Sequence, residues 1–184
     1  AAVAGLLTRN GTVLNAATGQ ANLYIKGANT GQYYVSVRHR NHLGVMTKVP
    51  VALDTASLAT LIDFSKASTA TYGAAAQYIE GATAMLWAGD INADNRLFNV
   101  GISNDLLELM SAIIDDPANG ASDGNKNLNH ILYGYSSTDV NLDGYSIFAG
   151  PNNDVLIPML NVALHPNNQE LMAANYIISG VIPK

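Results

Sequence analysis

The fold of this chain is decided by a stretch that reads Asp139-Val140-Asn141-Leu142-Asp143-Gly144-Tyr145 and closes on Asn153-Asp154. The same pattern stands 49 residues earlier, where the chain reads Asp90-Ile91-Asn92-Ala93-Asp94-Asn95-Arg96 and closes on Asn104-Asp105. Both copies have Asp, Asn and Asp at loop positions 1, 3 and 5, Gly at position 12, and Asn-Asp at positions 15 and 16. So many identities at one fixed offset indicate a duplicated loop. The alternative is a pair of ordinary solvated turns, which use the same residue types.

Oxygen-bearing side chains at alternate positions of a tight loop are typical of calcium sites, because Ca²⁺ takes about six to eight oxygen ligands. Position 6 needs a sharp backbone turn, which Gly144 supplies and Asn95 tolerates better than most residues. The common EF-hand loop closes with a Glu at position 12, whereas here position 12 is Gly and an Asp follows four residues later. The sequence therefore predicts two Ca²⁺ sites in loops with a longer exit.

An apolar stretch follows the closing Asp of each loop, at residues 106–110 and 155–160. This placement predicts that each closing Asp opens a buried helix. Pro158 lies inside the second stretch, where a proline is tolerated only if the helix has just begun, because proline lacks a backbone N–H.

The amino-acid composition favours some classes of protein and argues against others. Charged residues make up 12% of the 184 residues, against a usual share of about 25%, and 48% are hydrophobic. A surface with so few charges favours burial against other copies of the chain. Nine Lys and Arg with no basic run argue against nucleic-acid binding. No apolar run approaches the ~18 residues that a membrane span needs.

The absence of cysteine excludes disulfide bonds and thiolate metal sites, which leaves calcium as the available cross-link. That combination fits an exported, extracellular protein of the cell surface. The chain begins at Ala1 without Met, and we read this as a processed or truncated N-terminus.

Residues 1 to about 50 have the composition of β-structure. Short runs rich in Tyr and Val are bounded by Gly, Asn and Thr, and they predict strands at residues 23–25, 32–40 and 45–51. Alternation in the second run places Tyr33, Val35, Val37 and His39 on one face. Both termini are apolar, at residues 1–7 and 176–183, and such a terminal strand must pair with something or remain an adhesive edge.

Residues 33–47 read YYVSVRHRNHLGVMT, and they are followed by Tyr72-Gly73, Trp87-Ala88-Gly89-Asp90 and the second loop. This order of motifs resembles a module of surface and secreted proteins of Bacteroidota, over roughly residues 31–183. The resemblance implies a mixed α+β fold. Residues 1–88 would form a β-sandwich-like (Ig-like) sheet with a connector, lacking one strand, and residues 89–184 a calcium segment with an apolar C-terminal strand.

The loops also resemble the duplicated calcium segments of dockerins, the small modules that dock enzymes onto scaffolds. This second resemblance implies a dockerin-like pair of loop-helix units. It also implies side-chain ligands at Asp90, Asn92, Asp94, Asp105, Asp139, Asn141, Asp143 and Asp154, with the backbone carbonyls of Arg96 and Tyr145 completing each set.

Three functions are compatible with these features. The first is a non-enzymatic structural subunit that assembles with copies of itself into a calcium-stabilised filament or surface layer, by strand addition between subunits. The second is a dockerin-like docking or anchoring module of a larger secreted protein, with an exposed helical face. The third is an enzyme, for which the best candidates are Arg38, His39, Arg40 and His42. Residues three apart on one strand point to opposite faces, so we favour a structural role for these four, linking the calcium segment to the sheet.

Two smaller signals concern modification and a further ion site. Asn10-Gly11-Thr12 fits an N-glycosylation acceptor and Asp54-Thr55-Ala56 resembles the O-glycosylation pattern of Bacteroidota, so Asn10 and Thr55 are candidate glycan sites. The polar segment 115–127 could hold a third ion, but its composition favours a solvated loop.

Overall fold

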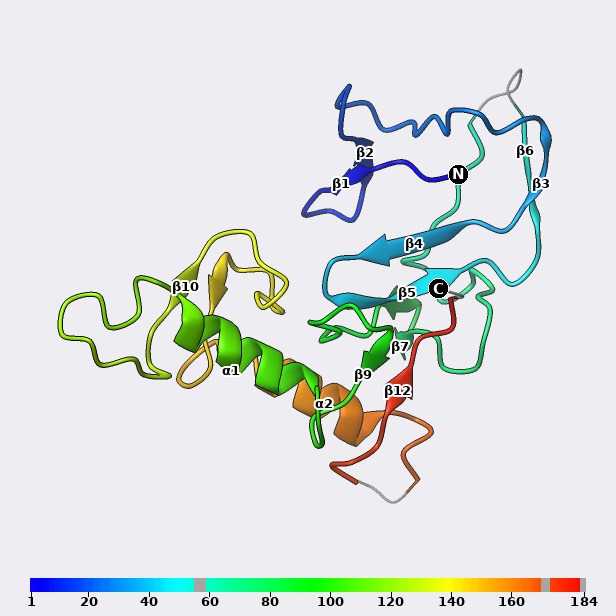
Figure 1. The fold of residues 1–184 in the computed structure, drawn as a ribbon. Helices are drawn as coiled ribbons and strands as arrows, with labels where there is room; N and C mark the ends of the chain where they lie inside the picture. Colours follow the sequence, from blue (N-terminus) through cyan, green and yellow to red (C-terminus); the bar gives the residue numbers. More distant parts are fainter. Residues whose placement is uncertain (55–58, 170–172, 183–184) are drawn as a thin grey trace.

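The computed structural model describes residues 1–54, 59–169 and 173–182, which form a mixed α+β fold (Figure 1). These residues contain two helices, α1 (Asp105–Asp115) and α2 (Leu156–Leu164). The strands are two to five residues long: β1 (Gly5–Leu7), β2 (Val13–Asn15), β3 (Gly31–Tyr33), β4 (Ser36–His39), β5 (His42–Met46), β6 (Val51–Leu53), β7 (Tyr78–Glu80), β8 (Thr83–Met85), β9 (Arg96–Leu97), β10 (Leu132–Tyr133), β11 (Tyr145–Ser146) and β12 (Ile178–Ser179). The mixed class is the one that the sequence predicts.

The strands pair two by two and make no larger sheet within the described residues. The six antiparallel pairs are β1–β2, β3–β6, β4–β5, β7–β8, β9–β12 and β10–β11. A sandwich needs two multi-stranded sheets whose inner faces cover each other, and no such sheets form here. The prediction of an Ig-like sandwich is therefore wrong.

The strand expected at residues 32–40 is divided between two pairs. Residues 31–33 form β3 and pair with β6, whereas residues 36–39 form β4 and pair with β5. The expected segment 45–51 is divided in the same way, between β5 and β6. The run expected at 23–25 forms no strand. Because the chain changes its partner strand within each of these segments, no sheet of more than two strands forms from them.

Side-chain burial follows the predicted alternation but stays shallow. Tyr33, Val35, Val37 and His39 are partly buried, while the residues between them are exposed. Residues 1–40, all of which the structure describes, contain no fully buried side chain. Residues 1–40 are therefore held by backbone pairing with little core of their own.

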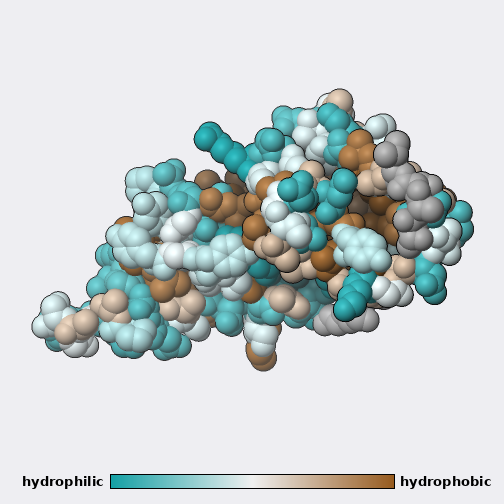
Figure 2. Space-filling view, turned by 90° about the horizontal axis from the view of Figure 1, so that it is seen from above, coloured by the Kyte–Doolittle hydropathy of each residue, from teal (hydrophilic) through white to brown (hydrophobic). Residues whose placement is uncertain are grey.

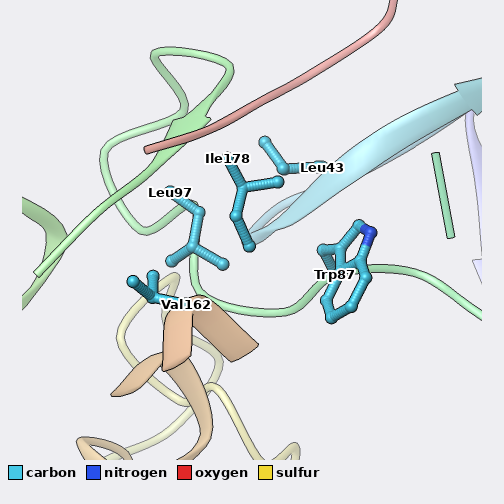
Figure 3. Close-up of a cluster of buried hydrophobic side chains, with 5 residues drawn as sticks. All are labelled: Leu43, Trp87, Leu97, Val162 and Ile178. Carbon is cyan, nitrogen blue, oxygen red and sulfur yellow. The ribbon is translucent and has the colours of Figure 1, made fainter. Parts of the chain in front are cut away.

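The principal core lies where the β4–β5 hairpin meets α2 and the C-terminal strand. Leu43, Trp87, Leu97, Val162 and Ile178 point toward one another in Figure 3 and are at most 3% exposed. Leu43 comes from β5, Val162 from α2 and Ile178 from β12. The cluster thus joins residues from both sides of the expected boundary at residue 88.

A second cluster surrounds the first helix. It contains Ala88, Ile91, Leu109, Ile113 and Val140, so α1 packs against the entry of both loops. The prediction of a dockerin-like pair is wrong, because α2 buries Val162 against the hairpin core rather than completing a separate two-helix unit with α1. Pro158 is the third residue of α2. It lies in the first turn of the helix, where a proline is tolerated.

The apolar C-terminal segment has a partner within its own chain. Ile178 and Ser179 pair with Leu97 and Arg96 of β9, and Ile182 is buried. Among the described residues, no helix is both long and apolar enough to cross a membrane.

Candidate metal centres

The two loops have the same backbone conformation. Left-handed φ angles, which are unfavourable for residues with a side chain, recur at corresponding positions of both loops. The matched pairs are Ala93 (56°) with Leu142 (63°), Asn95 (68°) with Gly144 (90°), Gly101 (117°) with Gly150 (117°), and Ser103 (59°) with Asn152 (57°). Four equivalent main-chain conformations would be improbable in unrelated loops, so the duplication extends from the sequence to the fold.

The hydrogen bonds at the loop entries also match. The carboxylate at position 1 accepts the backbone N–H of position 6, as Oδ2 of Asp139 does from Gly144 at 3.2 Å. The side-chain oxygen at position 3 accepts from the N–H of position 5, and the carboxylate at position 5 accepts from the N–H of position 7. These bonds are Asp94 N to Asn92 Oδ1 (3.0 Å), Arg96 N to Asp94 Oδ1 (2.8 Å), Asp143 N to Asn141 Oδ1 (2.9 Å) and Tyr145 N to Asp143 Oδ1 (3.0 Å). Each loop is thus closed around its own oxygen atoms.

The closing aspartates, Asp105 and Asp154, accept backbone hydrogen bonds from the other residues of their loops. Both are fully buried. Asp105 accepts the N–H of Ile91 at 2.8 Å and that of Phe98 at 3.0 Å, one on each carboxylate oxygen. Asp154 accepts from the residues at the same offset, Val140 N at 2.7 Å and Ile147 N at 2.8 Å. Since a carboxylate oxygen has two lone pairs, the Oδ2 atom of each closing aspartate, which accepts one of these bonds, retains acceptor capacity for a cation. Oδ1 of Asp154 also accepts the N–H of Asn141, at 3.1 Å.

The closing carboxyls are electrostatically unfavourable when ionised. Burial raises the pKa of Asp105 to about 7, and the negative charge of Asp90 raises it as well, against hydrogen bonds from Phe98 and Ile91 that lower it. Burial likewise raises the pKa of Asp154, with Asp139 adding to the effect. In each loop the position-1 and closing aspartates are therefore close enough to repel.

The remaining predicted ligand residues lie at the loop exits. Arg96 begins β9 and Tyr145 begins β11. Asn104 caps α1 by accepting the N–H of Leu107 at 3.1 Å, and Asn153 accepts that of Leu156 at the same distance. Helix α1 begins at its closing aspartate, as predicted, whereas α2 begins two residues after Asp154.

The set of oxygen atoms that each loop could offer as metal ligands is of the chemical type that calcium binds. It consists of carboxylate, amide and peptide oxygens, the ligands that this hard cation prefers. The described part of the chain contains no group of three or more His, Cys, Asp or Glu side chains arranged to hold a metal ion. Those four residue types are only part of the predicted calcium ligands, which also include Asn side chains and peptide carbonyls.

The histidines expected on one strand lie on two. His39 ends β4 and His42 begins β5, and the two residues pair across the hairpin. The sequence argument that they face opposite ways is therefore wrong, since their Nδ1 atoms are 2.9 Å apart. Burial, together with the charges of His39 and Arg40, lowers the pKa of His42 to about 3. Burial also lowers the pKa of His39, so at neutral pH the pair is uncharged.

Arg40 and Asn41 link the hairpin to the second loop, and Arg40 is one of the four residues from which such a link was expected. Arg40 donates to the backbone carbonyl of Ser136 at 2.7 Å and to the carboxylate of Asp139 at 3.2 Å. The buried amide of Asn41 donates to the carbonyls of Ser137 and Asp139. Sequence analysis did not identify Asn41, because nothing local shows which distant carbonyl an amide will reach.

The other sequence candidates lie apart from the loops. Asn10 is exposed in the turn between β1 and β2, where its side chain accepts the N–H of Thr12. Thr55 lies outside the described residues. In the polar segment 115–127, Asp116 pairs with His130 at 2.7 Å.

No known family model, curated protein or solved structure matches this chain. The physical features of the two loops and of the uncovered strands are therefore the basis for a functional proposal.

Proposed function

We propose that this protein is a non-enzymatic structural subunit that assembles with copies of itself into an extracellular filament or surface layer, with calcium in both loops. The observation that carries the proposal is that the hydrophobic side chains of the N-terminal strands are not buried by the rest of the described chain. Residues 1–40 include strand-forming Leu, Val and Tyr, yet none of them is fully buried.

The hairpin β1–β2 shows how little of this hydrophobic surface is buried. Leu6 and Leu7 of β1 are 55% and 54% exposed, although leucine contributes roughly 2 kcal/mol when its side chain is fully buried. Viewed from this end of the molecule, Figure 2 shows hydrophobic residues at the surface among hydrophilic ones. An isolated two-stranded hairpin is marginally stable in water, so a further strand or sheet from another molecule would stabilise it.

Strand addition between subunits would supply that cover. Among the described residues, β1 and β2 pair only with each other, so each has an edge without a partner strand, and such edges are templates for another chain. The C-terminal strand is already paired with β9, which makes residues 1–53 the better acceptor surface. Head-to-tail repetition of one such contact generates an open filament.

Calcium would act as the cross-link of the subunit. Each loop gathers three aspartates, and a bound cation would offset their mutual repulsion and the burial of the closing carboxylate. The absence of cysteine leaves the chain without disulfides, and extracellular calcium would provide an alternative. The resemblance to Bacteroidota surface modules supports the same location.

Matched lysine substitutions test the assembly surface. Leu6→Lys places a charge on the uncovered strand, and Leu164→Lys places the same charge on a comparably exposed leucine (61%) at the end of α2. Sedimentation in millimolar calcium should show that Leu6→Lys prevents assembly while Leu164→Lys does not. Equal assembly by wild type and both variants would refute the role of the N-terminal strands.

A second candidate function, a docking module, is supported by the surface of α2. Leu156, Met159, Leu160 and Leu164 are exposed and share one helical face. A docking module would remain monomeric and use this face to bind one partner, so a monomer whose tight binding to a protein partner is lost in Leu164→Lys would favour this reading.

A further inference from the structure

The two loops hold two different remote segments of the chain. The second loop contacts the tip of the β4–β5 hairpin, about a hundred residues earlier in the sequence. The first loop contacts the C-terminal segment, more than eighty residues later. In Figure 1, β12 runs beside β9, and the hairpin lies between the N-terminal strands and the helical end of the molecule.

At the second loop, the contacts converge on the first predicted ligand. The carboxylate of Asp139 accepts from Arg40 at 3.2 Å and from the backbone of Gly144 at the same distance. Its carbonyl accepts from Asn41 at 2.7 Å. One residue is therefore shared between the loop and the hairpin, and Arg40 is held in place by the ring of Tyr135, 4.0 Å from the guanidinium carbon.

At the first loop, the contacts converge on position 6. The amide of Asn95 donates to the carbonyls of Gly180 and Ile182, at 3.2 and 3.3 Å. The Asn95 carbonyl accepts the N–H of Gly180 at 2.8 Å, next to the β9–β12 pair. A side chain at residue 180 would collide with the Asn95 amide, so glycine is needed for this approach.

We infer that each calcium loop is a clamp for one segment: the second loop for the β4–β5 hairpin, and the first for residues 176–182. Arg40, Asn41 and Asn95 are the positioning residues of the two clamps. The inference rests on the proposed binding of calcium. An ion that orders Asp139 fixes the acceptors of Arg40 and Asn41, and an ion that orders the first loop fixes the position of Asn95. By linkage, each docked segment in turn favours its own ion.

The hydrogen bonds of the two clamps do not overlap, although Leu43 of the hairpin and Ile178 of the C-terminal segment share the principal core. None of the hydrogen bonds described above for the second loop involves residues 176–182, and none of those for Asn95 involves the hairpin. Loss of one ion should therefore loosen its own segment more than the other, which keeps its own hydrogen bonds.

Hydrogen exchange measured by mass spectrometry on the full chain tests this inference. The protein is kept in calcium below the concentration at which it assembles, and Asp94→Asn is compared with Asp143→Asn. We expect Asp143→Asn to accelerate exchange in the peptide covering 36–46, and Asp94→Asn in the peptide covering 176–182. Each acceleration should be roughly tenfold or more, since one to two hydrogen bonds are released, and each variant should accelerate exchange in the other peptide clearly less.

A second pair of variants removes the hydrogen bonds of the clamps without changing the side chain of a predicted calcium ligand. Arg40→Gln should loosen 36–46 more than 176–182, even in saturating calcium. Asn95→Gly, which suits the left-handed backbone at that position, should loosen 176–182 more than 36–46. Isothermal titration calorimetry with calcium is run on all four variants. If wild type binds two ions but both segments respond equally in each variant, or neither responds, the inference is refuted and the calcium sites stand. If wild type binds no calcium, the proposed function fails and this inference with it.

Discussion

Asparagine in place of the first closing aspartate should stabilise the metal-free protein and destabilise the calcium-bound one. The pKa of Asp105 lies at about 7 rather than 3.8, chiefly because the carboxyl is buried. Each unit of pKa corresponds to about 1.4 kcal/mol, so ionised Asp105 costs the metal-free fold on the order of 4 kcal/mol above pH 7. The folded protein binds more protons than the unfolded chain between about pH 4 and 7. The free energy of unfolding therefore falls as pH rises through that window.

The substitution Asp105→Asn removes this charge but also removes one acceptor. The amide keeps a single oxygen for the two buried N–H groups of Ile91 and Phe98, and the unsatisfied donor costs about 1–3 kcal/mol. At pH 8 in chelator the variant should thus be more stable than wild type by roughly 1–3 kcal/mol. Calcium at a thousandfold excess over its Kd stabilises a binding protein by about 4 kcal/mol per site. The variant should forgo this gain at the first loop, and the order of stability should reverse.

Urea unfolding followed by the fluorescence of Trp87 measures both quantities, because this single tryptophan is buried in the principal core. The experiment is run at pH 8 in chelator and in excess calcium, at a protein concentration too low for assembly. Asp115→Asn is the matched control, since Asp115 is exposed at the far end of the same helix. Equal destabilisation by Asp105→Asn in both conditions would show that Asp105 is only a structural acceptor.

Three further outcomes are expected. Calcium binding at pH 6 to 7 should release protons, because the raised pKa of Asp105 leaves its carboxyl partly protonated there; calorimetry in two buffers of different ionisation enthalpy measures the release, and identical enthalpies would contradict it. Asp94→Ala and Asp143→Ala should each reduce the calcium stoichiometry by one and lower the Tm in calcium, whereas unchanged melting on chelation of wild type would argue against both sites. Leu97→Ala should destabilise the fold by about 2–5 kcal/mol in urea, since Leu97 is fully buried, and a loss below ~1 kcal/mol would show that the core around it is loose.

The sequence predicted the local features well because they depend on neighbouring residues. The repeat at positions 1, 3 and 5 led to two loops with matching backbones, and the apolar stretches after Asp105 and Asp154 became α1 and α2. The alternation through Tyr33 to His39 also appears in the burial pattern. These features follow from spacing alone.

Long-range features could not be predicted in the same way. The run from residue 32 to 40 gives no sign that its two halves pair with different strands, and this break prevents the expected sandwich. The roles of Asn41 and Asn95 depend on carbonyls 98 and 87 residues away. The hairpin turn that brings His39 beside His42 lies within a motif that reads as one continuous strand.

The most direct test of calcium-dependent self-assembly is electron microscopy of the purified protein by negative stain, in millimolar calcium and again after chelation. Our account predicts regular filaments or sheets in calcium that disperse when the ion is removed. Isolated compact particles in both conditions, at high protein concentration, would contradict it.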